Sequence, residues 1–122
     1  MNSMHNTIDE LHRRAMKLAD EAFYAKREGN SELAQTKYLS AFEYERAAAM
    51  LLVNEYNQEP TRSVFFRSAA NLLLNLPHLE LEHYRQAERM IAFGLSGNPP
   101  EEIAAELREA WQELMELLKQ AA

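Results

Sequence analysis

Two pairs of side chains in this sequence have the spacing of a metal-binding motif. Asp9 stands three residues before His12, and Glu80 stands three residues before His83. Residues three apart on a helix face the same way, so each carboxylate and imidazole could share one ion. Carboxylate-bridged di-iron bundles combine two such pairs with a glutamate from each of two other helices.

Glu45 is a candidate for one of those additional glutamates, because it interrupts an otherwise apolar helical stripe. A carboxylate on an apolar stripe needs a partner, and we expect Arg13, Arg14 or Arg46 to reach it. However, so short a motif recurs freely, and both acid–histidine pairs fall in expected first helical turns, where acidic residues are common. We therefore predict solvated surface pairs, no metal, no cofactor and no catalytic residue, with Glu45 in a structural ion pair or at the rim of the core.

Other kinds of chemistry lack their usual motifs. The chain has no cysteine, which excludes a disulfide framework, a thiolate zinc site and a cysteine nucleophile. It has no glycine-rich phosphate loop and no serine or threonine in a nucleophile motif. A net charge of −6 argues against nucleic acid as a partner. No apolar run suits a signal peptide or a membrane span, so we expect a cytoplasmic protein without membrane contact.

Hydrophobic periodicity predicts an all-α fold of about five helices in a single domain, residues 1–122. Apolar residues recur at steps of three and four, and no segment alternates with the period of two typical of strands. The predicted parts are a first helical hairpin over 5–57, a second hairpin over 61–96 and a final helix over 99–120. A two-residue link in the first hairpin forces its helices to lie antiparallel.

Glycine, proline and capping residues set the expected helix ends. The expected boundaries are Gly29-Asn30, Tyr56, Pro60-Thr61, Leu76-Pro77, Leu95 and the run from Gly97 to Pro100. Ser31 is expected to cap the second helix and Asn98 the last one. Pro77 suits the first turn of the fourth helix. Gly29 is expected to take a left-handed conformation at the end of the first helix.

Residues 18–42 carry the pattern of a known helical repeat. The small and aromatic residues at its positions are Ala22, Phe23, Tyr24, Gly29, Ala34, Tyr38 and Ala41. This segment resembles a tetratricopeptide-repeat (TPR) unit, which is a helix–turn–helix of about 34 residues. The resemblance implies that Ala22, Ala34 and Ala41 lie where the two helices touch. The same hairpin is also similar to a microtubule-interacting-and-transport (MIT) domain.

A second copy of the pattern covers about 64–95. Ala69-Ala70 stand at its small positions, and Ala87, Ile91 and Gly94 repeat the later spacing. Its inter-helix segment LPHLELEHY has no glycine and is interpreted as holding about one extra helical turn. The resemblance implies antiparallel hairpins in a right-handed array, with the glutamate-rich last helix as the C-terminal cap that such arrays need.

The resemblance also implies a binding groove, because TPR proteins bind peptides along the first helix of each hairpin. Carried over by position, the groove residues are Met16, Ala19, Phe23, Lys26 and Arg27 with Arg67, Asn71 and Asn75. Independently, the helical wheel places Met16, Phe23 and Arg27 beside the core stripe rather than on it. In the third helix, Arg67, Asn71 and Asn75 continue from Ser63 as one exposed polar strip.

The expected function is that of an interaction module or adaptor, not an enzyme, which binds a segment of another protein in this groove. Arg67 and Asn71 resemble half of the clamp with which some TPR domains hold a terminal carboxylate, and this favours an acidic or C-terminal peptide. Three alternatives stay open. The chain could form a homo-oligomer, such as a homodimer, through the same surface; it could be a metal-dependent bundle enzyme; or these could be ordinary surface residues.

Overall fold

The structure is a computed structural model and describes residues 3–121 of the chain. Five α-helices account for most of this part, and it contains no strand, so the predicted all-α fold is confirmed. The helices are α1 Ser3–Arg27, α2 Ser31–Leu51, α3 Thr61–Leu74, α4 Leu81–Ser96 and α5 Glu101–Ala121. None of them is long and apolar enough to cross a membrane.

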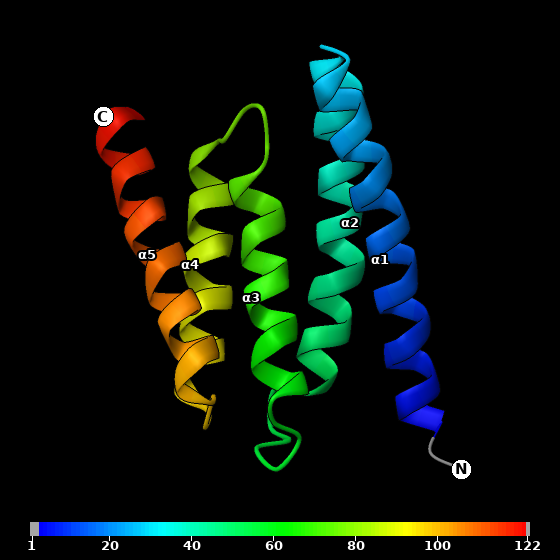
Figure 1. The fold of residues 1–122 in the computed structure, drawn as a ribbon, viewed down its shortest axis with the longest axis vertical. Helices are drawn as coiled ribbons and strands as arrows, with labels where there is room; N and C mark the ends of the chain where they lie inside the picture. Colours follow the sequence, from blue (N-terminus) through cyan, green and yellow to red (C-terminus); the bar gives the residue numbers. More distant parts are fainter. Residues whose placement is uncertain (1–2, 122) are drawn as a thin grey trace.

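Helices that follow one another in the sequence lie side by side and run in opposite directions (Figure 1). The row begins with α1 at one edge and ends with α5 at the other, and α5 also packs against α3. As a result, the chain runs in the same direction in α1, α3 and α5, and in the opposite direction in α2 and α4. Helix α3 lies at the centre, and Phe66, Ala69 and Leu73 on it are completely buried.

Small side chains allow α1 and α2 to pack along most of their lengths. Ala22, Ala34 and Ala41 are all completely buried, as expected for residues between two helices in close contact. Gly29 ends α1 with a φ of +79°, as predicted, and the following Asn30 donates its backbone N–H to Ala25 O at 2.9 Å. This is the left-handed termination that glycine adopts without a steric cost.

A second close contact lies where α4 meets α3 and α5. A Cβ atom built on Gly94 would lie 3.0 Å from both methyl carbons of Leu107 and 3.2 Å from Phe66 Cβ. These distances are shorter than ordinary van der Waals contacts. A methyl group at position 94 would therefore require Leu107 and Phe66 to shift by a few tenths of an ångström, so glycine suits this close approach of the three helices.

Several predicted helix ends are wrong because side-chain contacts set the true ones. Helix α2 ends at Leu51 rather than Tyr56, and Asn30 rather than Ser31 caps it, accepting a hydrogen bond from Leu33 N at 3.2 Å. Helix α5 begins at Glu101, so Asn98 lies outside it and does not cap it.

The predicted extra helical turn before α4 is also wrong. Helix α4 begins at Leu81, so Pro77 lies in the preceding loop. A capping box at Glu80 and His83 sets this start: the backbone N–H of His83 donates to Glu80 O at 3.0 Å, and His83 Nδ1 accepts a hydrogen bond from Glu80 N at 3.0 Å. The two residues therefore hold each other at the helix start instead of facing solvent.

Candidate binding surface

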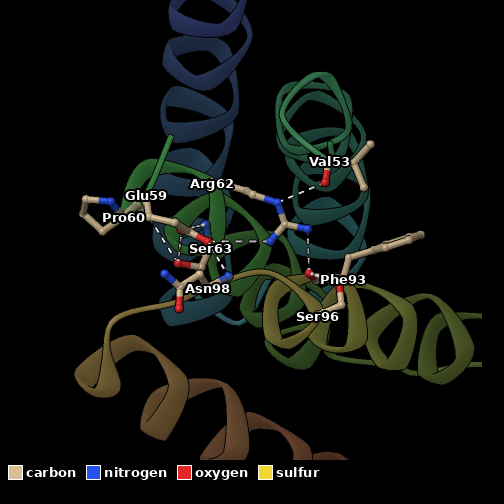
Figure 2. A network of polar contacts seen from close by, with 8 residues as sticks. All are labelled: Val53, Glu59, Pro60, Arg62, Ser63, Phe93, Ser96 and Asn98. Carbon is tan, nitrogen blue, oxygen red and sulfur yellow. Dashed lines mark hydrogen bonds and ion pairs between the residues drawn. The ribbon is translucent and has the colours of Figure 1, made fainter. Parts of the chain in front are cut away.

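Arg62 fixes the first turn of α3 against two other helices (Figure 2). Its side chain is completely buried, and its guanidinium donates to Val53 O at 3.0 Å and to Phe93 O at 2.9 Å. Val53 follows the end of α2 and Phe93 lies in the last turn of α4. Carbonyl groups at helix ends carry partial negative charge, so one buried cation satisfies two of them.

Glu59 completes this network from the loop before α3. One carboxylate oxygen accepts hydrogen bonds from Ser63 N at 3.0 Å and Ser63 Oγ at 2.7 Å. The other accepts from Asn98 N at 3.3 Å and lies 3.8 Å from Arg62 Nη1 (Figure 2). Ser63 is therefore buried, and the prediction that it belongs to an exposed strip is wrong.

A second junction joins the first three helices. Glu45 in α2 is completely buried, and both of its carboxylate oxygens lie within hydrogen-bond distance of His12 Nδ1, at 2.8 and 3.0 Å. The His12 ring stacks on Phe65 of α3, with ring centroids 4.7 Å apart. An ionised carboxylate only accepts hydrogen bonds, so this contact with ionised Glu45 requires the tautomer or charge state of His12 that carries a proton on Nδ1.

The arginines predicted to pair with Glu45 bind other carboxylates. Arg13 and Arg14 both pair with Glu10, and Arg46 pairs with Glu43. The hydrogen bond from Arg14 and, next, the positive charge of Arg13 lower the pKa of Glu10 below its usual value. Each of these pairs lies within one helix, so His12 is the side chain that reaches the buried carboxylate from a neighbouring helix.

The two acid–histidine pairs are not the solvated surface pairs that we predicted. His12 is bonded to Glu45 rather than paired with Asp9, and His83 is buried in the capping box at the start of α4. Within residues 3–121, no group of three or more histidine, aspartate and glutamate side chains could hold a metal ion. Both histidines serve helix packing and helix capping in this fold.

The predicted surface residues of α1 lie on the side of that helix that faces α3. His12, Met16, Ala19, Phe23 and Lys26 follow one another at steps of four and three, which keeps them on one face. The first of them stacks on α3, and the last donates from Nζ to Asn75 O at 2.7 Å. The three residues between them therefore share the flank that approaches α3.

Phe23 is the most exposed apolar side chain of this flank, with 51% of its surface accessible. Its ring packs edge-on against Tyr24, with centroids 5.9 Å apart. The Arg27 guanidinium lies over the same ring at 5.7 Å, so the apolar patch carries a positive charge. Met16 and Ala19 are partly exposed beside it.

Of the three groove residues predicted on α3, two side chains form hydrogen bonds within residues 3–121 and one does not. Arg67 donates to Glu106 Oε2 of α5 at 2.9 Å, so its guanidinium already has a carboxylate partner. Asn75 donates to Asn71 O at 2.8 Å. The Asn71 side chain is exposed and makes no hydrogen bond to any other residue in the described part of the chain. The structure thus joins Lys26 to Asn75 directly, whereas Arg67 is directed toward α5.

Sequence reasoning missed the most deeply buried polar residue of the fold, Arg62. An arginine in the first turn of a helix ordinarily reads as a solvated side chain. The one signal in the sequence was an aromatic residue before Arg62 and another after it, Tyr56 and Phe66. In the structure the guanidinium lies 5.1 Å from the ring centroid of the first and 5.2 Å from that of the second. Arginine stacks on such rings more readily than lysine does.

No protein-family description, no curated protein and no solved structure matches this chain. Function is therefore inferred from the chemistry of the surface formed by Met16, Ala19, Phe23, Lys26 and Arg27 of α1 with Arg67, Asn71 and Asn75 of α3. We refer to these eight residues as the α1–α3 surface.

Proposed function

We propose that this protein is a TPR-like interaction module, or adaptor, which binds a segment of a partner protein on the α1–α3 surface. The observation that carries the proposal is the half-exposed Phe23 on the flank of α1 that approaches α3. Large aromatic side chains backed by a rigid helix are typical anchors of protein interfaces. Successive helices are antiparallel, and the chain runs in the same direction in α1, α3 and α5. This alternation supports the comparison with TPR arrays.

Two polar groups on this surface suit an extended peptide. The free amide of Asn71 can accept from a peptide N–H and donate to a peptide C=O at the same time. The Arg27 guanidinium above Phe23 offers donors to a carboxylate or a carbonyl of the partner. Arg67 could hold a ligand carboxylate only by exchanging its contact with Glu106, so the main recognition is assigned to Phe23, Arg27 and Asn71.

Site-specific photo-crosslinking in cell extract tests this proposal. A photoreactive benzoylphenylalanine is placed at position 23 and, as a control, at position 51, because Leu51 is also exposed, at 40%, but lies at the end of α2. We expect one partner to be captured from position 23 and not from position 51. With the purified partner, Phe23→Glu should weaken binding by about tenfold or more, whereas Leu51→Glu should not. Equal capture from both positions would contradict the assignment of binding to this surface.

Self-association through the same surface is the competing function, and sedimentation equilibrium separates the two. If the chain is a stable dimer that Phe23→Glu dissociates, the surface serves self-assembly rather than a separate partner. If the chain is a monomer over the accessible concentration range, self-assembly is eliminated and the interaction module stands.

A further inference from the structure

A second site of distinct chemistry lies between α2 and α4, outside the α1–α3 surface. It is a cleft of ≈ 320 Å³, to which α2 contributes Leu39, Phe42 and Glu43, and α4 contributes Glu82 and His83. Its volume lies at the small end of the range found for ligand pockets, which suits a small ligand or a single side chain better than a large cofactor. None of its residues belongs to the surface proposed above, so the two sites can be tested separately.

His83 brings an unused hydrogen-bond donor to this cleft. Its Nδ1 accepts the backbone N–H of Glu80 at 3.0 Å, so the neutral ring must carry its proton on Nε2. In the described part of the chain Nε2 has no hydrogen-bond partner, and the nearest ionic contact is Glu82 Oε1 at 3.9 Å. The side chain is only 8% exposed, but Nε2 itself keeps contact with solvent, so an acceptor that enters the cleft can reach this N–H.

The walls of the cleft are negatively charged. Glu82 is 77% exposed and makes no hydrogen bond within the described residues. Glu43 uses one oxygen for Arg46, and its other oxygen has no partner there. The arginines of α4 nearest to Glu82, Arg85 and Arg89, line the adjoining hollow and do not form an ion pair with it. A cation entering the cleft would therefore meet two available carboxylates.

Apolar side chains complete the lining. Phe42 is almost fully buried at the base, and Leu39 is partly exposed beside it. Long cationic side chains commonly lay their methylene groups along such a surface while the charged end stays among polar groups. The neutral polar residues Ser40 and Gln86 make up the rest of the lining. A ligand that matches the carboxylates, the apolar residues and His83 has a cationic end, an aliphatic stem and a hydrogen-bond acceptor.

We propose that this cleft binds an arginine residue of a peptide. The guanidinium is held by Glu82 and Glu43, the methylene stem lies on Leu39 and Phe42, and the peptide carbonyl accepts the hydrogen bond of His83 Nε2–H. The planar fork of a guanidinium suits carboxylates better than the point charge of an ammonium does.

Nuclear magnetic resonance of the histidine ring nitrogens tests the site with N-acetylarginine amide as the probe. We expect a saturable shift of the His83 ring signals, and a much weaker one with N-acetylcitrulline amide, which has the same shape without the charge. Glu82→Gln and Glu43→Gln should each weaken binding by about fivefold or more. Glu88→Gln, a charge removal on α4 outside the cleft, is the matched control and should leave binding unchanged.

A further variant separates the carbonyl contact from the charge. His83→Asn keeps an acceptor for the capping box but lacks the Nε2 donor, and circular dichroism verifies that it folds. Because this variant lacks the His83 ring, its binding is followed by the backbone amide signals of Glu43 and Glu82. The substitution should weaken the binding of N-acetylarginine amide and leave the binding of butylguanidinium, which has no carbonyl, unaffected. The proposal is overturned if no saturable shift occurs, if Glu88→Gln weakens binding as much as Glu82→Gln, or if butylguanidinium binds the parent protein as tightly as the amide does.

Discussion

The guanidinium of Arg62 occupies the space that a side chain at position 97 would need. A Cβ atom built on Gly97 would overlap Arg62 Nη1 and would lie 2.9 Å from its Cζ. Position 97 follows α4 directly, and Arg62 belongs to the first turn of α3. The buried arginine therefore requires glycine in the α4–α5 connection, although the φ of Gly97, −88°, lies outside the left-handed region that favours glycine.

Gly97→Ala should therefore destabilise the protein although it adds only one methyl group. Overpacking in a filled interior costs about 1–3 kcal/mol, and here the neighbour is a hydrogen-bonded guanidinium that has little freedom to move. Urea unfolding followed by circular dichroism measures the effect. Ala92→Ser, on an exposed residue of α4, is the control and should change the free energy of unfolding by less than about 0.5 kcal/mol. Equal effects of the two changes would contradict the packing argument.

Arg62→Met should be among the most damaging single substitutions in the chain. It removes the donors to Val53 O and Phe93 O and leaves the Glu59 carboxylate without its nearest cation. Removing one partner of a buried charged network costs about 3–5 kcal/mol. Arg46→Met is the matched control, because Arg46 forms an exposed pair within α2 that is worth about 0–1 kcal/mol. Similar unfolding free energies for both variants would show that Arg62 does not hold the helices together.

Enlarging the small residues between α1 and α2 should also destabilise the fold. Ala22→Leu, Ala34→Leu and Ala41→Leu each place three more carbon atoms at a completely buried position, at a cost of about 1–3 kcal/mol. Thermal melting compares them with Ala92→Leu, which adds the same atoms at an exposed position of α4. If all three buried variants melt at the parent temperature, the register of this helix pair is wrong.

His12 and Glu45 should show energetic coupling in a double-mutant cycle. His12→Ala leaves a completely buried carboxylate without its partner, whereas His12→Ala in a Glu45→Leu background removes only the ring contact with Phe65. The coupling free energy is expected to be about 0.5–3 kcal/mol in the stabilising direction. Asp9→Ala combined with His12→Ala provides the control cycle. Additive effects for His12 and Glu45 would mean that their hydrogen bond contributes nothing to stability.

Much of the fold could be predicted because the buried residues of each helix recur in the sequence at steps of three and four. Gly29 and its left-handed conformation follow from the same local information. The start of α4 could not be predicted this way, because it depends on a histidine that takes a role usually filled by glutamate or glutamine.

For the candidate site, the helical wheel was sufficient to place Phe23 at the surface beside the core, since exposure on one helix is a local property. The helical wheel could not predict which side chains the polar residues bind. Glu45 was expected to bind an arginine and binds His12, and Arg67 was expected to be free and binds Glu106. In each case the deciding neighbour belongs to another helix, so the pairing depends on how the helices are arranged rather than on the spacing within one of them.

The position of α1 at the edge of the row has a consequence for its amide protons. Its backbone packs closely against α2, and it reaches α3 through side chains, with His12 on Phe65 and Lys26 at Asn75. A helix with one close neighbour can open without breaking the contacts among α3, α4 and α5, so its amides should exchange with solvent sooner than those of α3. A ligand that contacts both α1 and α3 would slow that exchange, and the protection of α1 amides would then report occupancy of the surface.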